Sequence, residues 1–340
     1  MRMKAATAVM IVLLVAVTAA PAQRRNERLF PVEQGGKYGY INSGGIIVIP
    51  FKFDYAADFH GGLAKVESNE KCGYINTAGE FVVRPQYDFL NSEDFSEGLA
   101  QAGTDRRKNG FIDTTGRMAI PATYFMTGKF SEGLAKVWPT PSEYGFINKA
   151  GRLVVPAVYS DYGCDFHEGL ACVKKDGKYG FVDKFGKIAI PFQFQQAFDF
   201  SEEIAPAELD KKWGFIDRTG VFVIPPQFDL AWSFQEGLAP ARIGEKWGFI
   251  AKAGRWAVPP QFDEVIGFSE GLAPVRLGAK WGYLRHDGTF AVAPQFEDAW
   301  IFDGGLAQVR IGARWALVNV NGTLVWKWDE DDDLYTTDQD

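Results

Sequence analysis

The chain has 340 residues, of which 46% are hydrophobic and 15% aromatic, so its composition is that of a folded protein and not of a disordered one. Its formal net charge is −7, and the acids of the last twelve residues, DEDDDLYTTDQD, account for that excess. The remainder is nearly neutral, which excludes a basic surface of the kind that holds nucleic acid.

A secretory signal peptide is the first element expected, at residues 1–22. Two basic residues precede the uncharged run AATAVMIVLLVAVTA, and Ala20-Pro21-Ala22 fits a cleavage site before Gln23. Export to the periplasm or the extracellular space follows from this interpretation. The alternative is an uncleaved inner-membrane anchor at residues 5–22, because the run approaches the ~18 residues that span a bilayer. A membrane contact is expected only in that case.

Residues 29–328 form a tandem array of about nine units. KWGFI stands at Lys212–Ile216 and Lys246–Ile250, and KWGYL at Lys280–Leu284, with a constant step of 34 residues. Two further stretches recur in the units, GLA and a P-x-aromatic-acid motif such as PQFD at Pro226–Asp229. A catalytic site is needed once, so a motif that recurs at this interval indicates a building part.

One unit, Gly237–Glu270, shows which strands the sequence predicts. LAPAR, WGFIA and RWAVP are three short strands, separated by turns at Gly244 and Gly254. A short loop that ends in glycine is typical of a bulged hairpin. PQFDEVIGFSE then leads to the next unit, so each unit is a three-stranded meander followed by a connector of roughly ten residues.

The array is expected to be all-β, with its meanders stacked in an open, superhelical, solenoid-like arrangement. Both faces of the strands are apolar, and only stacked neighbours can cover both. No unit is split between the two ends of the chain, and a blade of a closed propeller usually has four strands and about 40 residues. A closed, propeller-like ring is the alternative.

An aromatic residue precedes the glycine in most units, and we interpret it as part of the packing layer between units. The glycine after it leaves room for neighbouring backbone. The residues assigned to this repeat core are Tyr38, Tyr144, Tyr179, Trp213, Trp247, Trp281 and Trp315.

The combination of KWGFI, a glycine turn, VIPPQFD and FSEGLAPV resembles the WG-repeat family, or KWG-repeat family, of bacterial proteins. The resemblance covers residues 29–328. It implies a β-strand repeat scaffold that is often exported, and it carries no general enzymatic activity and no catalytic residues. Early units depart from the pattern at Cys72 and Asn109, which replace the aromatic residue.

The candidate binding residues lie in the connectors. Trp232, Trp300 and Phe198 share one slot, two residues before the Phe that recurs in the connectors. Other units fill this slot with unrelated residues. A variable slot is typical of the binding face of an array. Asp229 and Asp263 end the P-x-aromatic motif and could face a cationic partner, although turn hydrogen bonds explain such acids equally well.

No catalytic, phosphate-binding or metal-binding motif accompanies these residues, so neither an enzyme nor a cofactor nor a metal site is predicted. The cysteines are Cys72, Cys164 and Cys172. Cys164 and Cys172 are close enough in sequence to form a disulfide across a strand entry, and the alternative is three small buried residues. Residues 329–340 are predicted to be an acidic, disordered tail.

These observations predict a non-catalytic, exported repeat scaffold that binds another macromolecule, a protein, along an extended surface. The alternative is a scaffold that binds glycan or cell wall by stacking exposed aromatic side chains on sugar rings.

Overall fold

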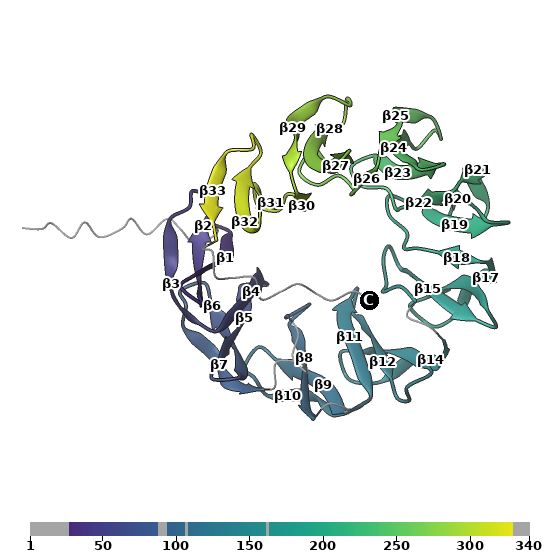
Figure 1. Cartoon of the computed structure of the whole chain (residues 1–340). Coiled ribbons are helices and arrows are strands. Elements are labelled where there is room, and N and C mark those ends of the chain that lie inside the picture. Colours follow the sequence, from purple (N-terminus) through teal and green to yellow (C-terminus); the bar gives the residue numbers. More distant parts are fainter. Residues whose placement is uncertain (1–26, 88–93, 106–107, 161–162, 329–340) are drawn as a thin grey trace, which may run out of the picture.

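The structure is a computed structural model that describes residues 27–328, apart from 88–93, 106–107 and 161–162. Nine antiparallel sheets follow one another around a ring (Figure 1), and the described residues contain no helix. Each sheet is a blade of a propeller, and we number the blades 1 to 9 in chain order. The predicted signal segment, residues 1–22, and the predicted acidic tail, residues 329–340, lie outside the described residues.

The first three blades contain β1 (Leu29–Gln34), β2 (Lys37–Asn42), β3 (Ile47–Phe53); β4 (Tyr55–His60), β5 (Leu63–Ser68), β6 (Lys71–Asn76), β7 (Phe81–Tyr87); and β8 (Leu99–Asp105), β9 (Lys108–Asp113), β10 (Met118–Tyr124). Blades 4 to 6 contain β11 (Met126–Ser131), β12 (Leu134–Trp138), β13 (Tyr144–Asn148), β14 (Leu153–Tyr159); β15 (Leu170–Lys175), β16 (Lys178–Asp183), β17 (Ile188–Phe194); and β18 (Gln196–Ala197), β19 (Ala205–Leu209), β20 (Lys212–Ile216), β21 (Phe222–Phe228). Blades 7 to 9 contain β22 (Leu230–Ala231), β23 (Leu238–Ile243), β24 (Lys246–Ala251), β25 (Trp256–Phe262); β26 (Glu264–Val265), β27 (Leu272–Leu277), β28 (Lys280–Arg285), β29 (Phe290–Phe296); and β30 (Asp298–Ala299), β31 (Leu306–Ile311), β32 (Arg314–Asn319), β33 (Leu324–Lys327).

The predicted open, solenoid-like array is wrong, because the structure is a closed nine-bladed β-propeller (Figure 1). The strand pattern of each unit does not say whether the stack of units bends back on itself. An open array was expected because no unit is split between the two ends of the chain, whereas many closed propellers complete one sheet with strands from both ends. Here each sheet is built from one contiguous stretch, and the ring closes by side-chain packing between complete blades.

The seam between blade 9 and blade 1 is an apolar cluster. Phe30 and Val32 of β1 pack with Leu317 of β32 and with Trp328, and all four are buried. At the edge of this cluster Arg28, just before β1, forms an ion pair with Asp303, in the loop before β31. A buried apolar contact needs no shared hydrogen-bond ladder, since it is stabilised by the area removed from water.

The rings of Phe51 and Trp326 add to this seam. They stack with their centroids 5.8 Å apart and an interplanar angle of 29°. Offset stacking of this kind is favourable beyond the area it buries. The aromatic residues at the end of the chain therefore cover the first blade, and blade 1 in turn covers blade 9.

The connector of the predicted unit supplies a fourth strand in several blades. In blade 7, Leu230 pairs with Arg242 and Ala231 with Ala241, so the short strand β22 lies beside β23. Figure 1 shows β18, β22, β26 and β30 nearest the centre of the ring, and β21, β25 and β29 at its periphery. The connector was not recognised as a strand because only two of its residues belong to a regular ladder.

The glycine of the WG motif is required by a bulge in the outer strand of the same blade. Trp247 is opposite Phe262 and Phe249 is opposite Val258, so β25 contains two more residues than β24 over this stretch. The extra residues lie in the PPQ sequence, where proline cannot donate to the ladder. A Cβ on Gly248 would come 2.5 Å from the carbonyl oxygen of Val258. The repeated pairing of WG with PPQF is therefore one structural device.

Neighbouring blades pack through a second aromatic pair. The aromatic ring after the WG glycine meets the connector Phe of the next blade, as Phe215 meets Phe234 at 4.9 Å and Phe249 meets Phe268 at 4.9 Å. Equivalent pairs join all consecutive blades from 1 to 9. These tilted and edge-to-face contacts form the layer between blades.

Candidate functional site

The three aromatic candidates lie at the inner edge of the ring. Phe198, Trp232 and Trp300 directly follow the short inner strands β18, β22 and β30 (Figure 1). The amide of Trp232 donates to the carbonyl of Pro240 at 3.0 Å, and that of Trp300 donates to Gln308 at 2.9 Å. These bonds fix the backbone, so the side chain at this position is free to differ between blades.

Four aromatic rings form a continuous stack across blades 6 and 7. Phe198 lies 5.0 Å from Trp213 at 12° and 5.2 Å from Trp232 at 23°. Trp232 in turn lies 6.3 Å from Trp247 at 13°, and the guanidinium carbon of Arg242 is 5.5 Å from the centre of the Trp247 ring. Trp232 is thus in ring contact with one aromatic residue of each of the two blades.

The tryptophan side chains at the inner edge are more exposed than those of the WG motifs. Trp213 and Trp247 are buried, whereas Trp232 is 42% exposed and Trp300 is 53% exposed. Ile301, next to Trp300, is also exposed. Large apolar side chains that are ordered and yet accessible are typical of a binding surface. The structure therefore brings Phe198 and Trp232 together, with Trp300 two blades further around the ring.

Asp229 and Asp263 have a structural role between blades. Asp229 accepts a hydrogen bond from Lys212 Nζ at 2.6 Å and another from the Gly244 amide at 2.7 Å. Asp263 does the same with Lys246 Nζ at 2.6 Å and the Gly278 amide.

Both carboxylates are therefore held as anions. The lysine first, and the glycine amide second, lower the pKa of Asp229 and of Asp263 below the ordinary value. Each oxygen of the two carboxylates already accepts one hydrogen bond from within the propeller. Their binding role stays a prediction.

The repeat-core residues occupy the expected slot at the start of the second long strand of each blade. Tyr144, Trp213, Trp247 and Trp281 are buried, and Tyr38, Tyr179 and Trp315 are partly buried. Cys72 and Asn109, which replace the aromatic residue in blades 2 and 3, are buried as well. Asn109 compensates by donating to the carbonyl of Phe125 at 2.8 Å.

A polar cluster that the sequence did not reveal lies beside blades 4 to 6. His167 Nε2 is 3.6 Å from Asp199 Oδ2, and Lys136 Nζ is 3.2 Å from Asp165 Oδ1. Burial raises the pKa of Asp199 above the ordinary aspartate value, and His167 only partly offsets it. The sequence does contain a hint of this pairing, because the same two dipeptides, Phe-His and Asp-Phe, occur at His60 and Asp94. The side chains of His60 and Asp94 also lie 3.7 Å apart.

Cys164 borders this cluster, and its thiol is not activated. The adjacent Cys172 thiol and burial raise the pKa of Cys164 well above its ordinary value. A nucleophilic cysteine needs the opposite shift. The amide of Cys164 donates to the carbonyl of Cys172 at 2.8 Å, and the cysteines are free thiols. This bond between the segment before β15 and β15 itself brings the two residues side by side, and their oxidation stays a prediction.

In the described ranges no group of three or more His, Cys, Asp or Glu side chains is arranged to hold a metal ion. No helix within the part of the chain that the structure covers is long and apolar enough to cross a membrane.

Comparison with known proteins agrees with this geometry. The family described as WG containing repeat matches residues 38–72, 73–105, 110–137, 144–179, 179–213, 213–247, 247–281 and 281–315. A crystal structure of the eukaryotic initiation factor is similar in fold, with a TM-score of 0.62 and 13% identity over 89% of this chain and 96% of that one. The computationally designed Ika8 protein has a TM-score of 0.50 and 10% identity over 89% of this chain and 99% of its own. At these identities the likeness concerns the fold alone. No curated protein matches the chain.

Proposed function

This chain belongs to the WG-repeat family, and on that premise we propose that it is a non-catalytic propeller scaffold that binds a protein partner at the inner edge of blades 6 to 9. The observation that carries the proposal is the exposure of Trp232 and Trp300, at 42% and 53%, directly after a short inner strand. The fold does not need an indole there, because Ile266 and Cys164 fill the same slot in other blades. Exposed Trp side chains are the commonest anchors of protein interfaces.

A protein partner suits the aromatic stack better than a glycan does. A sugar ring stacks on an open aromatic face, and Trp232 already stacks on the rings of Phe198 and Trp247. The part of Trp232 that stays exposed suits contact with the side chains of a polypeptide. Trp300 has no ring contact within the described ranges, so stacking of a glycan on Trp300 is the second candidate function.

We also propose that the scaffold works outside the cytoplasm. The support is the basic start, apolar run and Ala20-Pro21-Ala22 site of the sequence. Amino-terminal sequencing of the protein purified from the cell envelope or the medium is expected to begin at Gln23. A mature protein that begins at its first residues and sediments with membranes would support the anchor at residues 5–22 instead.

Site-specific photocrosslinking tests the protein partner. A photoreactive phenylalanine analogue is placed at Trp232 or Trp300 in the full chain, in its native cells. The matched control is Phe185, an equally large side chain that is 87% exposed in the hairpin between β16 and β17. Discrete protein adducts at both inner positions and not at Phe185 are expected. Adducts only at Phe185, or none at either inner position, would contradict the proposal.

Cosedimentation with insoluble peptidoglycan or polysaccharide separates the second candidate. Retention that is lost in Trp300→Ala and kept in Phe185→Ala would favour glycan stacking. Retention that is equal in the two variants, or absent from the wild type, would leave Trp300 without a glycan role.

A further inference from the structure

Consecutive blades are joined by a repeated ionic clamp on the face that carries the hairpins after the WG strands. A glutamate in the turn before the GLA strand accepts an amide of the next blade, as Glu202 does from Gly237 at 2.9 Å. A basic side chain from the next blade completes the clamp. The five pairs are Glu97–Lys149 at 3.1 Å, Glu132–Lys184 at 3.0 Å, Glu168–Arg218 at 3.8 Å, Glu202–Lys252 at 3.0 Å and Glu236–His286 at 3.2 Å.

In three of these clamps the cation also contacts the backbone of the glutamate. Lys149 Nζ donates to the carbonyl of Glu97 at 2.8 Å, and Lys252 Nζ donates to that of Glu202 at 3.1 Å. Arg218 makes the same contact with Glu168 at 2.7 Å. A carboxylate and a carbonyl oxygen on one residue thus form a small acceptor site that suits an ammonium or guanidinium group.

The clamp between blades 8 and 9 lacks its cation. The position that holds Lys252 in blade 7 and His286 in blade 8 is occupied by Val320 in blade 9. Glu270 nevertheless keeps the conformation of the other clamp glutamates, with φ 53°, against 55° in Glu202. It accepts the amides of Gly304 at 2.7 Å and Gly305 at 2.8 Å, and no cation pairs with it among the residues that the structure covers.

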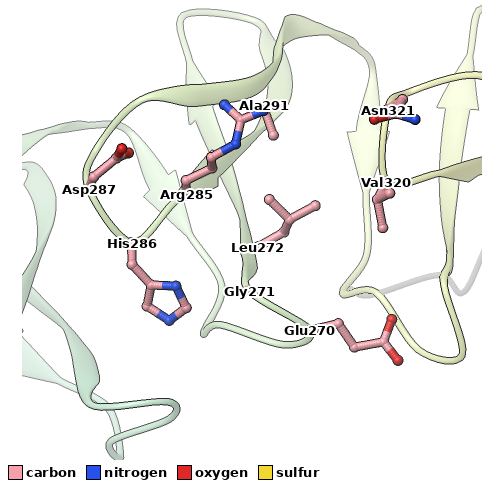
Figure 2. Close-up of a pocket in the computed structure, with 9 residues that line it drawn as sticks. All are labelled: Glu270, Gly271, Leu272, Arg285, His286, Asp287, Ala291, Val320 and Asn321. Carbon is pink, nitrogen blue, oxygen red and sulfur yellow. The ribbon is translucent and has the colours of Figure 1, made fainter.

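A pocket of about 540 Å³ occupies the place of the missing side chain. Figure 2 shows Glu270 and Val320 on its blade 9 side and His286 on the opposite side, with Leu272 between them. This volume lies in the range of small-ligand sites. Glu270 brings the carboxylate of the clamp. The Asp287 carboxylate accepts from the amide and hydroxyl of Thr289 in its own hairpin, and the Arg285 guanidinium donates to the carbonyl of Phe290 at 2.8 Å. The pocket therefore has a fixed acceptor and an apolar wall.

We propose that this pocket binds the side chain of a lysine or arginine from a protein partner, which supplies the cation that the sixth clamp lacks. The cationic group bonds to Glu270 as Lys252 bonds to Glu202, and the aliphatic stem packs along Leu272, Ala291 and Val320. The identity of the ligand as a protein side chain rests on the proposed function, while the selectivity for a cation rests on the pocket alone.

The test uses the full chain and two small probes, N-acetyl-lysine methylamide and N-acetyl-norleucine methylamide, with binding followed by saturation-transfer NMR and titration. The lysine probe is expected to bind to the wild type and the norleucine probe is not. Glu270→Gln is expected to weaken binding about tenfold, because one charge-assisted bond is lost. The matched control is Glu245→Gln, an exposed glutamate in the hairpin between β23 and β24, which should bind as the wild type does.

Val320→Lys gives an independent readout. The new side chain restores the cation of the repeat and fills the pocket, so the variant should lose the lysine probe and unfold at a higher temperature than the wild type. Binding of the lysine probe to Val320→Lys as to the wild type, or equal binding of the norleucine probe, would overturn the proposal. Probe binding without crosslinks at Trp232 and Trp300 would keep this pocket and refute only the inner-edge partner site, and crosslinks without probe binding would do the reverse.

Discussion

The carbonyl oxygen of Ile224 lies 2.4 Å from the position that a Cβ on Gly214 would occupy. The same approach recurs in the other WG blades, because the outer strand bulges toward the glycine. The tryptophan of the motif is buried in the core, and the glycine leaves room for the bulged backbone of the outer strand. The two residues of the motif thus serve different parts of one blade.

Gly214→Ala should therefore lower the free energy of unfolding. The added methyl group meets backbone atoms of Ile224 and Pro226, which cannot rotate away, so we expect a loss of about 1–3 kcal/mol. Urea unfolding followed by far-UV circular dichroism measures it. Gly44→Ala is the control, because its Cβ would meet nothing closer than 3.4 Å. Equal stability of the two variants would contradict this role of the WG glycine.

Glu202→Gln should weaken the contact between blades 6 and 7. Burial of the carboxyl opposes ionisation, but the Gly237 amide and the Lys252 ammonium outweigh it and hold the pKa of Glu202 below the ordinary glutamate value. The contribution to stability is therefore present above that ordinary value and is lost as pH falls through the folded-state pKa. We expect a cost of about 1 kcal/mol at neutral pH.

Unfolding of the Glu202→Gln variant at two pH values checks the sign. The difference from the wild type should shrink as pH falls below the ordinary glutamate pKa and disappear once the carboxyl is protonated in both states. Glu245→Gln should show no difference at either pH. A cost that persists unchanged at low pH would mean that the clamp does not depend on the charge of Glu202.

Asp199→Asn should have the opposite sign. Burial raises the pKa of Asp199, so the native state holds its proton more tightly than the unfolded state does. No penalty exists below the ordinary aspartate pKa, and the penalty grows as pH rises toward the raised value. The variant should melt at a higher temperature than the wild type at pH 7 and at the same temperature at about pH 3.

The neighbouring carboxylate supplies the matched comparison for Asp199. Asp165 lies 3.2 Å from Lys136, so Asp165→Asn should lower the melting temperature at neutral pH instead of raising it. Two variants that shift the melting temperature in the same direction would contradict the distinction between a buried carboxyl and a paired one.

Trp328→Ala should loosen the seam of the ring. The indole is buried against blade 1, and its removal leaves a cavity that costs about 3 kcal/mol. Hydrogen exchange measured by mass spectrometry should rise first in Leu29–Gln34, the strand that forms the other side of the seam. Trp300→Ala removes an exposed indole and should leave that protection unchanged. Faster exchange in blades 4 to 6 instead would place the weak point elsewhere.

If the protein is exported, as proposed above, Cys164 and Cys172 are expected to form a disulfide. The amide of Cys164, in the segment between β14 and β15, donates to the carbonyl of Cys172 in β15, which brings the two residues side by side. The raised pKa of the Cys164 thiol should make formation slow, because thiolate is the reacting species. Peptide mapping without reductant should detect the linked pair, with Cys72 free. Two alkylated thiols in protein from the oxidising compartment would disprove the pair.

The repeated motifs correctly predicted the three long strands of each blade. The prediction of an open array was wrong, because the blades form a closed ring. Gly254 and its equivalents correctly indicated the hairpins, and in the structure they have positive φ. The inner strand escaped notice because its ladder is two residues long, and the ring escaped because Phe30 and Leu317 are separated by almost the whole chain. Patterns within one unit carry no information on the small rotation from unit to unit that decides between a spiral and a circle.

The candidate site was predictable only in part. An indole at Trp232 was a candidate because most other units fill its slot with unrelated residues, but its stacking on Phe198 joins two blades and needed coordinates. The empty clamp at Glu270 could have been found from sequence, since Val320 breaks a column of basic residues. It was missed because the cation and its glutamate lie about 50 residues apart along the chain, and nothing local links them.

Each described blade is encoded by one contiguous segment of the chain, and blades 1 and 9 share no sheet. Duplication or loss of one repeat in the gene would therefore add or remove a whole blade and leave every remaining sheet intact. A propeller whose last sheet is completed by both ends has no such freedom, because its first strand must always reach its last sheet. The seam at Phe30 and Trp328 is thus the one contact that must adapt whenever the number of repeats changes.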